Sequence, residues 1–273
     1  MLERNCLVYA LHGTVSGFDA RLFVHLNLMA PETFVRHLVT RPSPYVDLST
    51  ALRGGGDALT IDDATHAAFE AAMVARENGH AVTLFVNPLN VEHGVPYFFA
   101  RLNVILDSNR RAEVEYIGVR YPLGTRDELM RLRRGVKKTL CSLATEDERQ
   151  SHITAVARLL EVEEPPLPEH LRTLSLRELR DLMAAGVRVE NHGWTHCHPF
   201  ALDDARYAAE LEQARQWLAD RCNMTSSCYA VPFGRTLPRR RSEDLYGTYL
   251  LLDGSLFEGR VGPRIVNRAS LNL

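Results

Sequence analysis

The stretch ENHGWTHCHP, residues 190–199, contains three histidines within seven positions, His192, His196 and His198. Imidazole is the commonest metal ligand among protein side chains. Two histidines four residues apart can reach one ion, whether they stand on a helical turn or on a loop that follows a strand. The stretch therefore predicts a metal site with His192 and His196 as ligands and His198 in a supporting role. A pair of core or surface histidines is the simpler alternative.

Two adjacent carboxylates offer the oxygen ligand that such a site needs. Asp62 and Asp63 follow the mostly apolar run ALTI, residues 58–61. A catalytic zinc usually has three protein ligands and one open position. A divalent ion would also offset the repulsion between two neighbouring charged carboxylates. The simpler alternative is that Asp63 only caps the helix that follows it.

Strands that alternate with helices must position these side chains. Short apolar runs that end in polar residues predict the strands, and segments rich in helix formers predict the helices. Such alternation gives parallel strands whose carboxyl ends meet at one edge, so the sequence predicts an α/β fold. Arginine-rich residues 89–170 interrupt the pattern and are expected to form a helical insertion within a single domain, residues 1–273. The expected strands lie within residues 6–13, 57–63, 81–88, 187–193, 226–234 and 248–254, and the expected helices within 65–78, 175–186 and 203–221.

Length and composition fit a folded domain with a sizeable core: the chain has 273 residues, of which 45% are hydrophobic. A formal net charge of -2 gives no reason to expect a nucleic-acid partner. Five cysteines at scattered spacing argue against a disulfide framework. The opening MLERNCLVYALHG has no signal-peptide pattern, and no apolar run reaches the roughly 18 residues of a membrane span. We therefore expect a cytoplasmic protein without a transmembrane segment.

The ordered motifs resemble those of the polysaccharide deacetylase family, the nodulation-deacetylase homology group that is similar to carbohydrate esterase family 4. TIDDA at 60–64 resembles the family's T-F-D-D-G motif, and HGWTH at 192–196 resembles its H-[ST]-x-x-H motif. YAVPFG at 229–234 resembles the R-x-P-Y-G motif, with alanine and phenylalanine in place of arginine and tyrosine. The resemblance covers about residues 5–88 and 171–268. Each motif is weak alone, whereas the ordered set is specific.

The resemblance implies a distorted (β/α) barrel of about seven strands that carries a metal-dependent hydrolase site. Asp62 matches the family's catalytic base. The backbone N–H of Phe233 matches its oxyanion donor, with Pro232 beside it as a substrate contact. The implied metal ligands are Asp63, His192 and His196. The implied ion is divalent, Zn²⁺ being the expected one, and it would activate water for amide hydrolysis while Asp62 takes the proton.

Two departures from the family pattern leave roles open. Ala230 stands where many members have an arginine beside the base, and no histidine follows His198 to serve as the family's late general acid. We expect Arg264 to supply the missing cation. We expect His12, in a segment YALHG that resembles a first-strand histidine motif of some members, to donate a proton or contact the substrate. The simpler alternatives are a surface ion pair for Arg264 and a loop hydrogen bond for His12.

The expected activity is removal of an acetyl or formyl group from an amino-sugar-containing substrate, either a small molecule or a lipid-linked sugar. Hydrolysis of another C–N bond, of the cyclic amide type, is an alternative within the same class. A non-catalytic glycan-binding protein that retains the metal is the alternative from another class, although binding alone needs no base at Asp62. Metal analysis together with an assay for acetate or formate release tests these alternatives.

Basic residues gather in the insertion between Arg126 and Lys138. A solvated helix face is the simpler explanation of such a run. The sharper hypothesis is that part of this run, including Arg131 and Arg134, contacts the substrate by holding a phosphate of a nucleotide-linked or lipid-linked sugar. The sequence does not indicate an oligomeric state.

Overall fold

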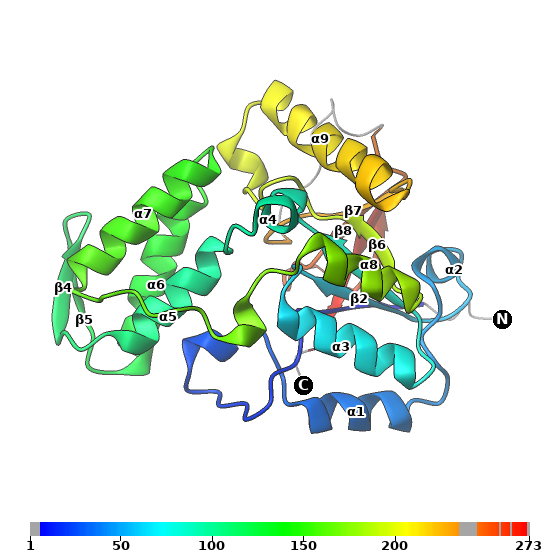
Figure 1. Cartoon of the computed structure of the whole chain (residues 1–273), viewed down its shortest axis with the longest axis horizontal. Coiled ribbons are helices and arrows are strands. Elements are labelled where there is room, and N and C mark those ends of the chain that lie inside the picture. Colours follow the sequence, from blue (N-terminus) through cyan, green and yellow to red (C-terminus); the bar gives the residue numbers. More distant parts are fainter. Residues whose placement is uncertain (1–5, 235–244, 257, 263, 272–273) are drawn as a thin grey trace.

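The computed structural model describes residues 6–234, 245–256, 258–262 and 264–271, and a large sheet lies at its centre (Figure 1). Within these residues the sheet has nine strands in the order β11-β1-β2-β3-β6-β7-β8-β10-β9. Its neighbouring strands are parallel except for the antiparallel pair β9 and β10. The strands are β1 (Val8–Leu11), β2 (Ala58–Asp62), β3 (Val82–Val86), β6 (Arg188–Asn191), β7 (Cys228–Ala230), β8 (Thr248–Leu251), β9 (Gly259–Gly262), β10 (Ile265–Asn267) and β11 (Ala269–Ser270).

The predicted α/β class is confirmed, since helices alternate with most of these strands. A capping box begins α8 (Leu176–Ala184), with Ser175 and Glu178 each bonding the other's backbone N–H. The described residues contain more strands than the expected seven or so, because short strands from β9 onward extend the sheet. The helices that cover the sheet are α1 (Pro31–Thr40), α2 (Leu48–Leu52), α3 (His66–Glu77), α8 (Leu176–Ala184) and α9 (Asp204–Cys222).

Helix α3 packs closely on the sheet because its inner face is alanine. The fully buried residues on this face are Ala67, Ala68, Ala71, Ala72 and Ala75. Gly13, just after β1, lies against this helix with φ +143°, and a Cβ there would come within 2.4 Å of the Ala67 carbonyl carbon. Only glycine fits such a contact and such a backbone conformation. The contact fixes the preceding residue, His12, at the carboxyl end of β1.

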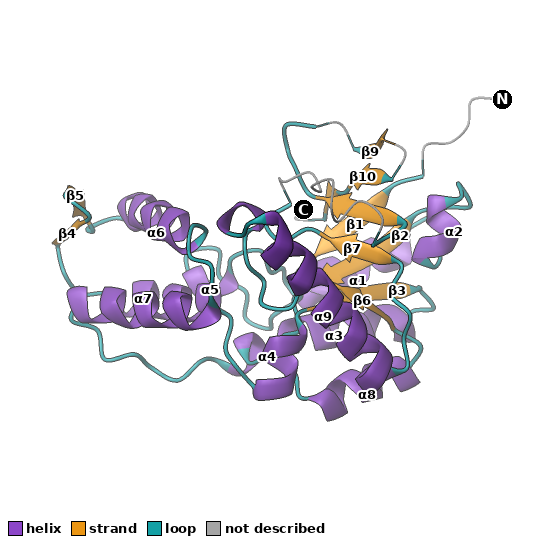
Figure 2. Cartoon of the chain, turned by 90° about the horizontal axis from the view of Figure 1, so that it is seen from above, coloured by secondary structure: helices purple, strands orange, loops and turns teal. Residues whose placement is uncertain are grey.

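Between β3 and β6 the chain leaves the sheet and forms a largely helical lobe, which Figures 1 and 2 show to one side of the strands. The lobe also contains an antiparallel hairpin that the sequence pattern did not indicate. It has a hydrophobic core of its own, which Phe233 joins from the end of β7. Its elements are α5 (Phe98–Ser108), β4 (Glu113–Tyr116), β5 (Val119–Pro122), α6 (Arg126–Leu140) and α7 (Glu146–Leu159). The short helix α4 (Pro88–His93) precedes them and packs Val91 into the core beside the sheet. Thr125 and Thr145 form capping boxes that begin α6 and α7.

The segment formed by residues 265–270 pairs with strands near both edges of the sheet. Its first part, β10, pairs with β8, and its second part, β11, pairs with β1. Between them the N–H of Arg268 donates to the carbonyl of Leu251 at 2.9 Å. Arg268 therefore lies between the part of the segment that pairs with β8 and the part that pairs with β1. Among the described residues, no helix combines the length and the apolar character that a membrane crossing requires.

Candidate active site

The predicted metal ligands come together at the carboxyl ends of β2 and β6. Asp63 follows β2, and His192 and His196 lie on the loop that follows β6. The Nε2 atoms of His192 and His196 are 3.7 Å and 3.4 Å from Oδ1 of Asp63. All three side chains are buried, and one ligand atom from each lies within 4.8 Å of the others. Asp63 and His192 are 129 residues apart in the sequence, yet together with His196 they form one compact group of donors.

These donors fit a divalent ion. Oδ1 of Asp63 is a buried atom without a hydrogen-bond partner in the described part of the chain, and the imidazole nitrogens that face it are too distant to donate to it. Ligand atoms about 2.0–2.1 Å from a tetrahedral zinc would lie roughly 3.3 Å from each other, close to the observed separations. A mixed nitrogen and oxygen set is one that Zn²⁺ accepts. Asp63, His192 and His196 are therefore the residues that would hold the ion.

Asp63 is not the cap of the helix that follows it. That position belongs to Thr65, whose side chain accepts a hydrogen bond from the N–H of Ala68 at the start of α3. Asp63 instead has a left-handed backbone conformation, with φ +66°. Such a conformation is uncommon outside glycine, although aspartate tolerates it better than most residues. The backbone turns here so that the side chain leaves the strand end toward the two histidines.

The protonation states of the histidines suit metal binding. Burial lowers the pKa of His192 and lowers that of His196 well below its ordinary value, so both rings are neutral at pH 7. Nδ1 of His192 lies 2.8 Å from the carbonyl of Ala230, which can only accept, so this nitrogen carries the proton. Nε2, which faces Asp63, then has a free lone pair for a metal ion. Most metal-binding histidines likewise carry their proton on the other ring nitrogen.

The two neighbouring carboxylates have opposite pKa shifts. Burial and the charge of Asp62 raise the pKa of Asp63 well above its ordinary value. Burial alone would also raise the pKa of Asp62, but the guanidinium of Arg268, with help from His192, outweighs it and holds the pKa below its usual range. Asp62 is thus ionised at any working pH, whereas Asp63 needs a positive charge beside it to ionise fully.

The cation beside Asp62 is Arg268, which corrects the expectation for Arg264. Nη1 and Nη2 of Arg268 donate to Oδ1 and Oδ2 of Asp62 at 2.7 Å and 2.6 Å, and both side chains are buried. A second bond from Nη1 goes to the hydroxyl of Thr60. Arg264 directly precedes β10, whereas Arg268 directly follows it, and Arg264 is exposed. The sequence offered two arginines in the stretch PRIVNR, and only the pairing of β10 and β11 shows which one turns inward.

His12 lines the same cavity as the metal ligands, as expected for a residue at the end of β1. Its proposed role as proton donor is weakened by its electrostatics. Burial lowers its pKa to about 4, since the attraction of Asp62 is too small to restore the charged form. A neutral imidazole can donate a hydrogen bond, but it is a poor acid at pH 7. His12 therefore fits a substrate contact better than a general acid.

A buried hydrogen-bond network joins the Asp63 turn to the histidine loop. The hydroxyl of Tyr97 accepts from the N–H of Ala64 at 2.9 Å and donates to Oδ1 of Asn87 at 3.1 Å. The side-chain amide of Asn87 then donates to the carbonyls of His192 and Gly193 at 2.7 Å and 3.1 Å. No sequence motif indicates this network, because Tyr97 belongs to the insertion and neither Tyr97 nor Asn87 lies in one of the recognised motifs.

The Tyr97→Phe variant is expected to weaken divalent-metal binding by roughly 10–100-fold, as loss of an outer-shell partner typically does. It leaves the N–H of Ala64 and Oδ1 of Asn87 without a hydrogen bond in the core, which costs about 1–3 kcal/mol of folding free energy. Metal Kd by chelator competition and unfolding by denaturant measure the two effects. Tyr116→Phe, which removes a hydroxyl bonded to Thr139 within the lobe, should lower stability alone. An unchanged metal Kd in Tyr97→Phe would show that the network does not organise the ligands.

The histidine loop is also held from two helices. The N–H and hydroxyl of Thr195 donate to Oε1 of Glu210 on α9 at 2.5 Å and 2.9 Å. Nη2 of Arg149 on α7 donates to the carbonyl of Thr195 at 3.3 Å, and Arg149 is itself paired with Glu146 at 3.0 Å. His196 follows with φ +52°. The lobe and the sheet domain therefore both fix the backbone that carries the second histidine.

The third motif lies at the same cavity. Phe233 has φ +64°, a rare conformation for a bulky residue, and it packs on His196 with ring centroids 5.0 Å apart. Strained backbone of this kind occurs most often at functional sites. Val231, Phe233 and Gly234 line the cavity, whereas Pro232 is not among its lining residues. The assignments of Phe233 as oxyanion donor and of Pro232 as substrate contact stay predictions.

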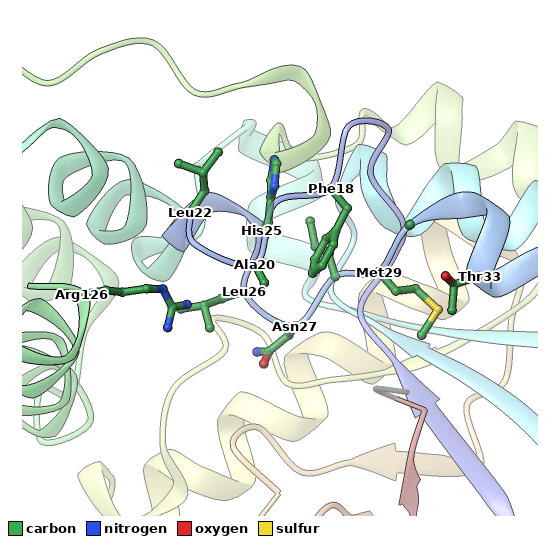
Figure 3. A pocket seen from close by; sticks show the side chains of 11 residues that line it. Phe18, Ala20, Leu22, His25, Leu26, Asn27, Met29, Thr33 and Arg126 are labelled. Atoms are coloured by element: carbon green, nitrogen blue, oxygen red, sulfur yellow. The ribbon is translucent and has the colours of Figure 1, made fainter.

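The site opens into a cavity of about 570 Å³ between the sheet and the helical lobe. Arg134 lines this cavity and Arg131 does not, so only the first of these two predicted contacts can reach a bound substrate here. His198 also lines it, and its Nδ1 accepts from the N–H of Phe200 at 3.2 Å. A second cavity of about 380 Å³ shares residues 26–28 with the first, and Figure 3 shows Arg126 extending into its wall beside Leu26.

Comparisons with known proteins bear on the fold and on the family of the chain. In solved structures the fold is similar to that of the Streptococcus pyogenes deacetylase PplD in complex with acetate (11% identity, TM-score 0.60, 97% of this chain and 92% of that chain). It is also similar to IcaB from Ammonifex degensii (12%, 0.57, 98% and 92%) and to the BpsB deacetylase domain from Bordetella bronchiseptica (10%, 0.51, 97% and 95%). At such identities the likeness concerns the fold alone. No curated protein sequence matches the chain.

The family itself is shown by the sequence. Residues 56–244 match the family model of polysaccharide deacetylase. The matched range includes Asp62, Asp63, His192 and His196, and it covers well over half of the 273 residues. The chain therefore belongs to the polysaccharide deacetylase family of hydrolytic de-N-acetylases.

Proposed function

We propose that this protein is a divalent-metal-dependent hydrolase that removes an N-acetyl or N-formyl group from an amino-sugar-containing substrate. The observation that carries the proposal is the unsatisfied buried Oδ1 of Asp63, which faces Nε2 of His192 and of His196 at 3.7 Å and 3.4 Å. Burying a carboxylate oxygen without a partner is unfavourable. A bound cation removes that penalty, so the arrangement supports a metal centre. Zn²⁺ is our choice of ion because the donors are two imidazoles and one carboxylate.

The residues of this chain supply the remaining chemistry. A divalent ion held by the triad would act as a Lewis acid and lower the pKa of a water that it binds. Asp62 stands next to the triad as the base, ionised and fixed in orientation by Arg268. The pairing lowers the basicity of Asp62 while it keeps the carboxylate ready to accept a proton. The backbone N–H of Phe233 is the proposed donor to the oxyanion of the tetrahedral intermediate.

The non-catalytic alternative is less well supported than catalysis. A protein that only retained a metal to bind glycans would need the triad but would have no use for a buried Asp62–Arg268 pair beside it. Such a pair is expensive to bury unless its geometry is good and its remaining hydrogen bonds are made. Here the guanidinium bonds both carboxylate oxygens and Thr60 as well. Hydrolysis of a cyclic amide uses the same groups, so only a substrate panel distinguishes it from deacylation.

The proposal extends to the cellular location of the protein and to the class of its sugar substrate. We propose a cytoplasmic setting, with a small sugar-containing molecule or a lipid-linked sugar as substrate. The support for such a substrate is the basic wall of the cavity that holds the candidate metal centre. Comparison of acetate and formate release from a set of N-acylated amino sugars identifies the acyl group.

Removal of the metal is expected to abolish activity reversibly. Dialysis against a chelator should eliminate acyl release, and one equivalent of Zn²⁺ should restore it, because the triad provides one set of donors. The His192→Ala variant should neither retain nor regain the ion, as one of three protein ligands is gone. Elemental analysis and an acetate or formate assay on the same samples measure both effects. Full activity in a verified metal-free sample would refute the metal-dependent mechanism.

A further inference from the structure

Four basic side chains of α6 face the cavity that holds the candidate metal centre. They are Arg133, Arg134, Lys137 and Lys138, which we call the α6 cluster. Positions three and four apart lie on one face of a helix, so the four side chains form one stripe. Arg131, three residues before Arg134 on the same helix, does not line the cavity.

Among its described lining residues, the cavity has an excess of positive charge. Its described lining contains the α6 cluster and Arg268 as permanent cations, against the carboxylates of Asp62 and Asp63. Asp62 is already neutralised by Arg268. A divalent ion at the triad would consume the charge of Asp63 and add to the excess. A concave surface with one sign of charge concentrates ligands of the opposite sign, so the cavity is suited to an anion.

Three members of the α6 cluster, Arg133, Arg134 and Lys138, form no ion pair with a carboxylate among the described residues. Nε of Arg133 donates to the neutral Oδ1 of Asn103 at 2.8 Å, and burial together with Arg126 lowers the pKa of this guanidinium to about 10. Among the described residues, neither Arg134 nor Lys138 has a carboxylate within ion-pair distance. A solvated surface run would normally alternate with acidic residues, whereas no acidic residue follows Glu128 in α6.

The α6 cluster begins close to the reacting centre. Nζ of Lys137 lies 4.9 Å from the ring centroid of Phe233, a cation–π contact. The same ring packs on His196 at 5.0 Å between centroids. One aromatic ring therefore separates the cluster from a metal ligand. A group held by the cluster would belong to the same small substrate whose amide is at the triad.

We propose that the α6 cluster binds a phosphate group of the substrate, so that the acylated amino sugar is recognised as a phosphorylated or diphosphate-linked sugar. A phosphate carries up to two charges and several acceptor oxygens, which suits two or more cations in a stripe, whereas a carboxylate is satisfied by a single arginine fork. A nucleotide diphosphate sugar and a lipid diphosphate sugar share this chemistry. The identity of the sugar substrate rests on the proposed function, but recognition of phosphate does not.

Direct binding tests the inference. The metal-loaded full chain is titrated by calorimetry with N-acetylglucosamine 1-phosphate and with the neutral methyl glycoside of the same sugar. The wild type should bind the phosphate more tightly. The double variant Arg134→Gln/Lys138→Gln should lose roughly tenfold or more in affinity for the phosphate and none for the glycoside. Arg131→Gln on the same helix is the matched control and should behave as wild type, since glutamine keeps a similar helix propensity.

Three results would overturn the inference. The first is equal affinity of the wild type for the two sugars. The second is phosphate affinity unchanged in the double variant, which would place the phosphate on the metal instead. The third is equally tight binding of an N-acetylated hexosaminuronic acid, which would make the subsite one for carboxylates.

Further titrations with a nucleotide diphosphate N-acetylhexosamine and with a polyisoprenyl diphosphate N-acetylhexosamine in vesicles identify the source of the phosphate. Tighter binding of either one than of the glycoside supports the inference. Acyl release without a phosphate preference would refute this inference and leave the proposed function intact. Phosphate binding without acyl release would refute the proposed function and leave this inference intact.

Discussion

The Asp62→Asn variant is expected to lose about 10²–10⁴-fold in kcat while it keeps one equivalent of divalent metal. The amide cannot accept a proton from the attacking water, and Asp62 is not one of the three donors of the triad. The variant also leaves Arg268 with a neutral partner in the core, so some loss of stability accompanies the loss of rate. Turnover and metal content are therefore measured well below the melting temperature of the variant.

A matched comparison separates the base from the ligand beside it. Asp63→Asn changes the neighbouring carboxylate in the same way, and it should lose metal and activity together. The two adjacent variants thus divide the chemistry of one dipeptide. Near-wild-type kcat in Asp62→Asn would assign the base to another group of the cavity, and loss of metal from it would place Asp62 among the ligands.

Removal of the buried cation is expected to have the second largest effect. The Arg268→Gln variant should lose about 3–5 kcal/mol of unfolding free energy at neutral pH, because it leaves the buried charge of Asp62 unpaired. It should also move the acidic limb of kcat/KM to higher pH, since the pKa of Asp62 is no longer held down by the guanidinium. Denaturant unfolding and a pH–rate profile measure these changes.

The sign of the pH dependence of stability follows from the lowered pKa of Asp62 in the folded protein. The stability that its pairing supplies is present above the unfolded pKa, about 4, and is lost as the pH falls through the lower folded value. The difference between wild type and Arg268→Gln should therefore be largest near neutral pH and shrink below pH ~4. Arg264→Gln, four residues earlier and exposed, should lower stability far less and leave the acidic limb where it is. Equal effects of the two variants would remove Arg268 from its proposed position beside the base.

The ligand group could be predicted from the sequence because each ligand belongs to a short motif at a strand end. Asp63 directly follows β2, and His192 directly follows β6, so the order of strands alone brings them to one edge. The resemblance to the polysaccharide deacetylase family then implies which of the two adjacent carboxylates is the ligand, Asp63, and which is the base, Asp62. No long-range contact had to be known beyond the parallel pairing that the alternation of elements indicates.

The supporting residues could not be predicted in this way. Arg268 and Arg264 are equivalent in sequence terms, and the difference arises from which edge strand each part of one segment joins. Tyr97 acts through a hydroxyl that meets Asn87 and Ala64 only after the helical lobe has packed on the sheet. The hairpin β4–β5 was missed although β4 alternates exposed and buried residues, because each strand has only four residues and β5 buries none of them.

The place of residues 265–270 in the chain has a consequence for how the protein acquires its activity. This segment bonds β8 with one half and β1 with the other, strands that are separated by more than two hundred residues. Contacts between such distant parts of a chain form late, because a long loop must close before they add stability. The guanidinium that orients Asp62 is carried by this same segment. During synthesis on the ribosome, the metal ligands can therefore meet before the base is set in place, and nascent chains that already bind metal should still be inactive.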